Sequence, residues 1–264
     1  MRVLVTGAAS GIGRATCLKL ARDASLRGET GQVAAVDIGP SAALESLLGE
    51  LRELGAEPLP LYGDMGATDA PARVVGEAAD RFGGLDGLVS NAGVNRPGPL
   101  ATYPVEDWDR LFAVNTRATF LLAQAAYSTL KATGGAIAIV GSMSGSNAHA
   151  GLGAYAPTKA AVIMLMRVLA QEFGRDGIRV NSVSPGMVRT GMTEAVYADA
   201  EIAAARDELV PLGRVARPDD IADVIAFLLS PQARYVNGHD LIADGGVSGN
   251  HLGRLPGLTQ VTRA

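Results

Sequence analysis

Tyr155 and Lys159 are the residues of this sequence whose types and spacing could carry out chemistry. Four positions apart in a predicted helix, their side chains lie on one face and can point into one site. A cation close to a phenol stabilises the phenolate and lowers the pKa of the phenol from about 10 toward the working pH. A tyrosine in that setting can act as a general acid or base. Because such a pair also occurs by chance on surface helices, the remainder of the chain must decide its role.

The elements that would position this pair are short apolar runs that alternate with longer segments of helical periodicity. The runs predict strands at residues 2–5, 32–36, 57–61, 85–89, 136–140, 178–183 and 239–242. The longer segments predict helices at 12–22, 41–54, 70–82, 105–131, 155–173 and 218–229. The alternation predicts an α/β fold with a parallel sheet. We expect one domain with a seven-stranded parallel sheet and helices on both faces.

A glycine-rich turn joins the first predicted strand to the first helix. Gly7, Gly11 and Gly13 would let main-chain N–H groups approach a pyrophosphate at the helix N-terminus, with Ser10 and Ile12 among the contacts. The spacing is G-x-x-x-G-x-G rather than the commoner G-x-G-x-x-G. Glycines that serve only a tight turn are the alternative, and the flanking strand and helix favour a nucleotide site.

Asp37 stands at the end of the second predicted strand. A carboxylate there can accept hydrogen bonds from both hydroxyls of the adenosine ribose and would repel a 2′-phosphate. No Arg or Lys lies between Gly7 and Gly13 or beside Asp37 to hold such a phosphate. The sequence therefore favours NAD over NADP. A solvated Asp in a turn is the alternative.

Polar and small residues also follow the third and fourth predicted strands. Asp64, which precedes Met65, could bind the adenine amino group or simply cap the next helix. The run of Asn91, Ala92 and Gly93 lets main chain approach a ligand. Since ligands bind at the carboxyl ends of the strands of an open parallel sheet, we place these residues in the cofactor site.

The composition excludes several classes of function. A net charge of -4 leaves no basic excess to meet nucleic-acid phosphates. No apolar run reaches the roughly 18 residues of a membrane span, and the N-terminus lacks the apolar length of a signal peptide. Cys17 is the single cysteine, so it forms no intramolecular disulfide, and it is expected in the core. The three histidines are far apart, so we propose no metal. We expect a cytoplasmic protein with no nucleic-acid partner.

Asn115 interrupts the long predicted helix at 105–131, beside apolar neighbours. If buried there, its amide needs partners, and a system of carbonyl groups and water around a lysine is one candidate. An ordinary exposed asparagine is the alternative.

Taken together, the motifs resemble those of the short-chain dehydrogenase/reductase superfamily in its compact form of about 250 residues. The resemblance spans nearly the whole chain, and it implies one doubly wound Rossmann domain over residues 1–246, followed by a tail at 247–264. It rests on Thr6–Gly13, Asp64, Asn91-Ala92-Gly93, Asn115, Ser142, Tyr155-x-x-x-Lys159, Pro185-Gly186 and Asp244-Gly245-Gly246.

The resemblance implies a catalytic set. Ser142, thirteen positions before Tyr155, would polarise the substrate carbonyl or hold the alcohol, unless it is only a turn residue. Tyr155 would take the hydroxyl proton in oxidation or donate one in reduction. Lys159 would bind the nicotinamide ribose and lower the pKa of Tyr155, and Asn115 would place a water next to Lys159.

The resemblance also implies a second group of cofactor contacts after the sixth strand. Pro185, Gly186, Val188 and Thr190 match the segment that holds the nicotinamide carboxamide. The Val188 main chain and the Thr190 hydroxyl are the expected contacts. Pro185 and Gly186 could equally be a simple chain reversal.

The substrate would lie under a variable lid at residues 191–212. The lid and its surroundings would form a mixed apolar pocket for a small or medium secondary alcohol or ketone. The residues expected to form its walls are Val94, Met143, His149, Met187, Met192 and Tyr197.

The two helices at 105–131 and 155–173 carry more apolar residues than one sheet-facing stripe requires. In the resembling family these helices pair across a two-fold axis. We therefore expect a homotetramer, with a dimer as the alternative.

The leading hypothesis is an NAD-dependent alcohol dehydrogenase or carbonyl reductase. An NADPH-dependent 3-ketoacyl-type reductase is the alternative, and Asp37 argues against it. A sugar-nucleotide epimerase of the extended relatives would need a longer C-terminal substrate domain. A binding protein without chemistry would not require the set of Ser142, Tyr155, Lys159 and Asn115.

Overall fold

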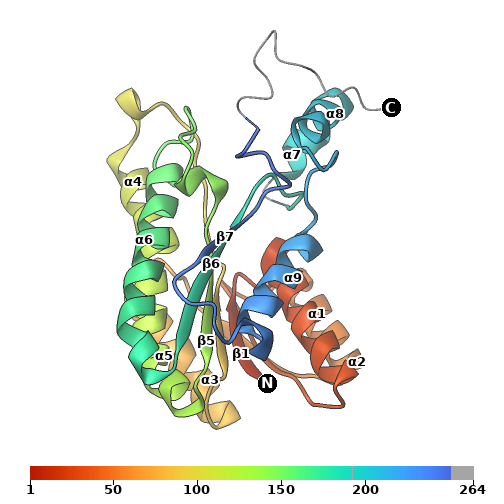
Figure 1. The fold of residues 1–264 in the computed structure, drawn as a ribbon, viewed down its shortest axis with the longest axis vertical. Coiled ribbons are helices and arrows are strands. Elements are labelled where there is room, and N and C mark those ends of the chain that lie inside the picture. The colour runs from red at the N-terminus through yellow and green to blue at the C-terminus, as the bar shows by residue number, and fades with distance from the viewer. Residues whose placement is uncertain (192, 251–264) are drawn as a thin grey trace.

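The computed structural model describes residues 1–191 and 193–250. Its centre is a seven-stranded parallel sheet in the order β3-β2-β1-β4-β5-β6-β7, as the sequence predicts (Figure 1). The strands are β1 Arg2–Thr6, β2 Gln32–Asp37, β3 Glu57–Tyr62, β4 Gly87–Ser90, β5 Ala136–Val140, β6 Arg179–Pro185 and β7 Asp240–Ala243. Because β1 pairs with β2 on one side and with β4 on the other, the strand order reverses there. The connections that follow β1 and β4 therefore lead to opposite faces of the sheet, as at a ligand-binding crevice.

Helices cover both faces of the sheet (Figure 1). On one face lie α1, α2 and α9, and on the other lie α3, α5 and α6. The helices are α1 Gly11–Leu26, α2 Ala42–Glu53, α3 Ala70–Phe82, α4 Val105–Phe112, α5 Ala118–Thr133, α6 Tyr155–Phe173, α7 Glu194–Tyr197, α8 Ala200–Leu209 and α9 Pro218–Leu229. No helix of the described chain combines the length and apolar content needed to cross a bilayer.

Alternating strand residues build the two cores. Val3 and Val5 of β1 pack with α1, α2 and α9, whereas Leu4 between them packs with α3, α5 and α6. This division follows from the two-residue period of a strand. All five residues of β5 are buried, as expected for a strand covered on both faces. Cys17 on α1 is fully buried in the first core, and burial raises the pKa of its thiol to about 12. The expectation of a core cysteine is confirmed.

The predicted single helix at 105–131 is wrong in one respect. The chain forms α4, then a π-helical turn η2 at Ala113–Arg117, and then α5. Hydrophobic periodicity does not detect a π-turn, which adds one residue to the helical repeat. Asn115 lies in this turn and is 3% exposed, which confirms the buried alternative.

Two short helices stand beyond the carboxyl edge of the sheet, within the predicted lid. Figure 1 shows α7 and α8 above the ends of the central strands. Their inner side chains form a small separate core around Tyr197 and Val210. Met192 lies outside the described residues, and so do residues 251–264 of the predicted tail.

Candidate active site

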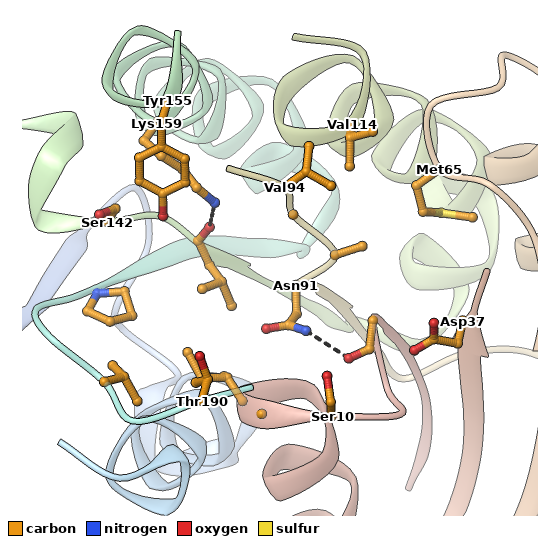
Figure 2. Close-up of a pocket in the computed structure, with 18 of the residues that line it drawn as sticks. Ser10, Asp37, Met65, Asn91, Val94, Val114, Ser142, Tyr155, Lys159 and Thr190 are labelled. Carbon is orange, nitrogen blue, oxygen red and sulfur yellow. Dashed lines mark hydrogen bonds between the residues drawn. The ribbon is translucent and has the colours of Figure 1, made fainter. Parts of the chain in front are cut away.

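A cavity of about 430 Å³ opens at the carboxyl edge of the sheet, and most of the predicted site residues line it (Figure 2). From the expected cofactor and catalytic sets it collects Gly7, Ser10, Gly11, Ile12, Asp37, Asp64, Met65, Asn91, Ala92, Gly93, Ser142, Tyr155, Lys159, Pro185, Gly186, Val188 and Thr190. These residues come from seven separate segments of the chain. The structure therefore brings together what the sequence only placed at successive strand ends.

The turn between β1 and α1 forms a cradle that only small residues permit. A Cβ atom on Gly13 would lie 2.1 Å from the Gly7 carbonyl oxygen, and one on Gly7 would lie 3.0 Å from the Asn91 amide nitrogen. Gly7 also has φ +66, a conformation that favours glycine. Ser10 is the N-cap of α1 but its side chain makes no capping hydrogen bond. Ser10, Gly11 and Ile12 line the cavity, so the N-terminus of α1, which no Ser10 side chain caps, borders the space that an anion would occupy.

Asn91 fixes this cradle to the end of β4 rather than facing a ligand with its amide. Its Nδ2 donates to the carbonyl oxygens of Thr6 at 2.9 Å and Gly7 at 3.2 Å. The main-chain N–H groups of Asn91 and Ala92 each donate to the Thr6 hydroxyl at 3.0 Å. Thr6 and Asn91 therefore hold the ends of β1 and β4 together. Figure 2 shows the amide of Asn91 turned toward the β1 turn.

Asp37 lies at one end of the cavity, away from Ser142 and Tyr155 (Figure 2). Its Oδ2 accepts a hydrogen bond from the Ala9 main-chain N–H at 2.8 Å, and its Oδ1 accepts from the N–H of Ile38 at 2.8 Å. The carboxylate is thereby held at the turn. The two basic residues among the described cavity walls are Lys159 and Arg110. Arg110 pairs with Asp64, not with Asp37.

Asp64 does not cap the following helix. Helix α3 begins at Ala70, and its N-cap is Asp69. The carboxylate of Asp64 instead accepts two hydrogen bonds from Arg110, each of 2.9 Å, and one from the Gly66 N–H at 2.8 Å. The hydrogen bonds from Arg110 lower the pKa of Asp64 below its ordinary value. Asp64 is therefore held as a carboxylate facing the cavity.

Tyr155, Lys159 and Ser142 meet at the other end of the cavity (Figure 2). Helix α6 presents Tyr155 at its first residue and Lys159 one turn later, so both side chains lie on one face. The Lys159 ammonium is 5.7 Å from the centre of the Tyr155 ring. Ser142 is the second residue after the end of β5. Its Oγ accepts a hydrogen bond from the Ser144 N–H at 3.1 Å.

Burial dominates the ionisation of this group. Desolvation raises the pKa of Tyr155 above its usual value, and a hydrogen bond with Ser142 partly opposes that increase. Desolvation lowers the pKa of Lys159 to about 8. The sequence led us to expect a lowered pKa for Tyr155, but in the chain by itself this pKa is raised. The reason is that desolvation of the phenolate outweighs the hydrogen bond. A further positive charge next to the phenol would be required.

Asn115 connects the loop after β4 to helix α6 through hydrogen bonds. Its Oδ1 accepts from the Val94 N–H at 2.8 Å, and its Nδ2 donates to the Val94 carbonyl at 2.9 Å and to the Thr158 hydroxyl at 3.1 Å. Both N–H groups of the Asn115 amide are used in these bonds, and one acceptor position of its Oδ1 is filled by the Val94 N–H. The expected water next to Lys159 stays a prediction.

Most of the residues expected to contact the substrate do not line the cavity. Val94 lines the cavity, but four others lie outside its walls: Met143, His149, Met187 and Tyr197. His149 is exposed, and its Nδ1 makes a 2.7 Å hydrogen bond with the Ser144 hydroxyl. Tyr197 is 8% exposed because its ring packs in the small lid core. Their roles toward a substrate stay predictions, as does that of Met192.

Sequence reasoning missed several residues of the cavity wall. They are Val36, Ile38, Gly63, Arg110, Val114, Val140, Gly141 and Thr193. Most are neighbours of predicted residues and could have been inferred from them. Arg110 and Val114 lie on α4 and η2, far along the chain from the strand ends, and Arg110 looks like a solvent-facing charge on an amphipathic helix.

Comparisons with known proteins agree with this geometry. A family model described as Enoyl-(Acyl carrier protein) reductase matches residues 7–248. The (3R)-3-hydroxyacyl-CoA dehydrogenase of Rattus norvegicus is 38% identical over 253 residues, which cover 92% of this chain and 95% of the relative. The L-rhamnose 1-dehydrogenase (NAD(P)(+)) of Azotobacter vinelandii is 36% identical, with 93% and 95% covered.

Solved structures show the same architecture. A short-chain type dehydrogenase/reductase from Mycobacterium ulcerans superimposes with a TM-score of 0.86 at 32% identity, over 93% of this chain and 89% of that chain. The family match, the relatives and this superposition all extend over nearly the whole sequence. This chain therefore belongs to the short-chain dehydrogenase/reductase superfamily, and it is an oxidoreductase of the class that interconverts alcohols and carbonyl compounds with a nicotinamide cofactor.

Proposed function

We propose that this enzyme transfers a hydride between NAD(H) and a secondary alcohol or ketone, with Tyr155 as the general acid/base. The observation that carries the proposal is the shared cavity of Ser142, Tyr155, Lys159 and Asp37. Its ends match the two ends of a dinucleotide: proton-transfer groups at one and a ribose-accepting carboxylate at the other (Figure 2). The glycine cradle between them fits a pyrophosphate.

The catalytic residues divide the proton chemistry. In oxidation, the Tyr155 phenolate takes the hydroxyl proton of the alcohol, and in reduction the phenol returns one to the carbonyl oxygen. Ser142 donates a hydrogen bond to the reacting oxygen and so stabilises the negative charge that develops there. The Lys159 ammonium stabilises the phenolate electrostatically. A bound nicotinamide would supply the hydride in reduction and accept it in oxidation. In its oxidised form it would also place a positive charge in the site.

Asp37 supports NAD as the preferred cofactor. Its fixed carboxylate would accept hydrogen bonds from the ribose hydroxyls, and it would meet a 2′-phosphate with like charge. The relative from Azotobacter vinelandii carries NAD(P)(+) in its name. That name admits both cofactors. The ratio of kcat/KM for NAD and NADP tests which cofactor this chain prefers.

The substrate is proposed as a small or medium secondary alcohol or ketone. Relatives act on 3-hydroxyacyl thioesters and on a sugar, judging by the names (3R)-3-hydroxyacyl-CoA dehydrogenase and L-rhamnose 1-dehydrogenase. The first name, together with the family description, keeps a 3-ketoacyl-type reductase as the second candidate.

We also propose a cytoplasmic homotetramer, with a dimer as the alternative. Leu122, Val162, Ile163 and Met166, which are apolar residues of these two helical segments, are buried within the chain. Phe120, Met164 and Val168 remain 42%, 54% and 45% exposed on α5 and α6, and they support an interface there. Light scattering after size exclusion tests the assembly.

The deciding experiment is a turnover screen over sugars, polyols, hydroxy acids, steroids and 3-hydroxyacyl thioesters, with NAD and NADP in parallel. We expect turnover of a secondary alcohol with NAD, and a loss of at least about 100-fold in kcat for Tyr155→Phe. Undiminished turnover in that variant would refute the mechanism. A firm preference for NADPH with a ketoacyl thioester would establish the second candidate.

A further inference from the structure

Arg110 forms a forked contact with Asp64 inside the cofactor cavity. Its Nη1 donates to Oδ2 and its Nη2 donates to Oδ1, both at 2.9 Å. Such a two-bond fork fixes the plane of a carboxylate as well as its position. Both side chains line the cavity, so the fork belongs to the wall of the site.

The fork leaves one acceptor position of the carboxylate open. A carboxylate offers about four acceptor positions, two on each oxygen. Asp64 Oδ1 accepts from Arg110 and from the Gly66 N–H at 2.8 Å, whereas Oδ2 accepts only from Arg110 among the described residues. The remaining position on Oδ2 suits a single hydrogen-bond donor.

The fork is poorly suited to a purely structural role. The Arg110 and Asp64 side chains are 37% and 41% exposed, and exposed ion pairs contribute little to folding stability. Gly66 adjoins the fork so closely that a Cβ there would lie 2.1 Å from Arg110 Nη1. A glycine at this position is thus required for the guanidinium to occupy its place.

We infer that Arg110 is a positioning residue for cofactor recognition: it orients Asp64 so that the open position of Oδ2 receives the amino group of adenine. The inference rests on the proposed function, since it requires an adenine dinucleotide in the cavity. It adds a second chain segment, α4, to the recognition of the base. Asp64 alone, without the fork, could rotate and offer its oxygens in several directions.

The test compares NAD with its hypoxanthine analogue, which carries a carbonyl oxygen in place of the adenine amino group. Calorimetric titration of the full chain gives a dissociation constant for each. We expect the wild type to bind NAD about tenfold more tightly than the analogue, because only NAD supplies a donor to the charged acceptor. In Arg110→Met this ratio should fall to about twofold, with the melting temperature little changed because the ion pair is partly exposed.

Three further variants separate orientation from charge and from general disturbance. Arg110→Lys keeps the charge but loses the fork, so its ratio should also fall. Gly66→Ala keeps Arg110 but displaces its guanidinium, and the ratio should fall again. Arg117→Met is the matched control: Arg117 lies further along the same helical segment and donates to the Gly66 carbonyl rather than to Asp64, so its ratio should stay at the wild-type value.

The outcomes separate this inference from the proposed function. A wild-type chain that binds neither dinucleotide would overturn both. A wild type that prefers NAD, with a ratio unmoved by Arg110→Met, would overturn the role of Arg110 alone. A full wild-type ratio in Arg110→Lys would show that charge, not the fork, is what matters, and would equally overturn it.

Discussion

The Lys159 ammonium donates a 2.8 Å hydrogen bond to the main-chain carbonyl of Val140, the last residue of β5. Ser142 follows Val140 by two residues, so the same strand end holds both the ammonium and the serine. Figure 2 shows this bond beside the Tyr155 ring. The cation next to the phenol is therefore anchored to a strand of the sheet and not only to its own helix. The packing of α6 against β5 therefore sets the position of Lys159 relative to Tyr155, the pair proposed for proton transfer.

Lys159 makes folding stability depend on pH. Its pKa of about 8 lies below the value of 10.5 for an unperturbed lysine, so the folded chain loses this proton first. Between these values the unfolded chain binds more protons, and stability rises with pH. We expect the contribution of Lys159 to the free energy of unfolding to increase by about 2 kcal/mol from pH 7 to about pH 9.5. Urea unfolding at both pH values measures it.

Two lysine variants identify the source of that rise. Lys159→Met should abolish it, while Lys131→Met, which removes an exposed lysine paired with Asp176, should preserve it. A rise that persists in Lys159→Met would show that another group causes it. Measurements stay below pH 10, because the raised pKa of Tyr155 acts in the opposite direction above its ordinary value.

Ser142→Ala should shift the pH profile of alcohol oxidation. The hydrogen bond with Ser142 lowers the pKa of Tyr155, so its removal raises that pKa. Oxidation requires the phenolate, and the rising limb of kcat/KM should therefore move to higher pH. Turnover should also fall by about 100-fold, since one donor to the reacting oxygen is lost. A reduced rate with an unmoved limb would show that Ser142 does not tune Tyr155.

Substitutions at Asp37 should alter cofactor choice. Asp37→Ala should weaken NAD binding and narrow its advantage over NADP. Asp37→Asn keeps an oxygen for the Ala9 N–H but removes the charge, so it should admit NADP while keeping the turn in place. The ratio of kcat/KM values for NAD and NADP is the measurement. If both variants keep the wild-type ratio, Asp37 does not read the ribose.

A pair of glycine substitutions tests the cradle. In Gly13→Ala the new Cβ would lie 2.1 Å from the Gly7 carbonyl, so the turn must shift and NAD binding should fall by at least about tenfold. Gly76, in the middle of α3, has no atom within 4 Å of such a Cβ. Gly76→Ala should raise stability by about 0.5–1 kcal/mol and leave NAD binding unchanged. Equal effects of the two variants on NAD binding would contradict the cradle.

The sheet was predictable because its strands are recognisable as separate apolar runs. The run from Ala136 to Val140 is buried throughout and bounded by glycines, so both its position and its environment follow from composition. The π-turn at Asn115 was not predictable from periodicity. It depends on hydrogen bonds to Val94 and Thr158, which are distant in sequence.

Most residues proposed for catalysis and cofactor binding line one cavity, and their gathering there was predictable because each occupies a strand end or a short motif. Arg110 was not, since its partner Asp64 is 46 positions away and nothing local distinguishes it from a solvated arginine. The substrate side was hardest. Tyr197 is aromatic and lies in the lid, yet its ring completes a small core with Ala203, Val210 and Val215 instead of facing the cavity.

The burial of Cys17 has a practical consequence. Cys17 carries the single thiol of the chain, on the buried side of α1. The pKa of this thiol is about 12. A thiol-specific reagent reacts with the thiolate and needs access to it. Labelling of the native protein should therefore proceed only through opening of the core around α1. The rate of modification at one atom then reports how often the core on the α1, α2 and α9 side of the sheet opens, with no added probe.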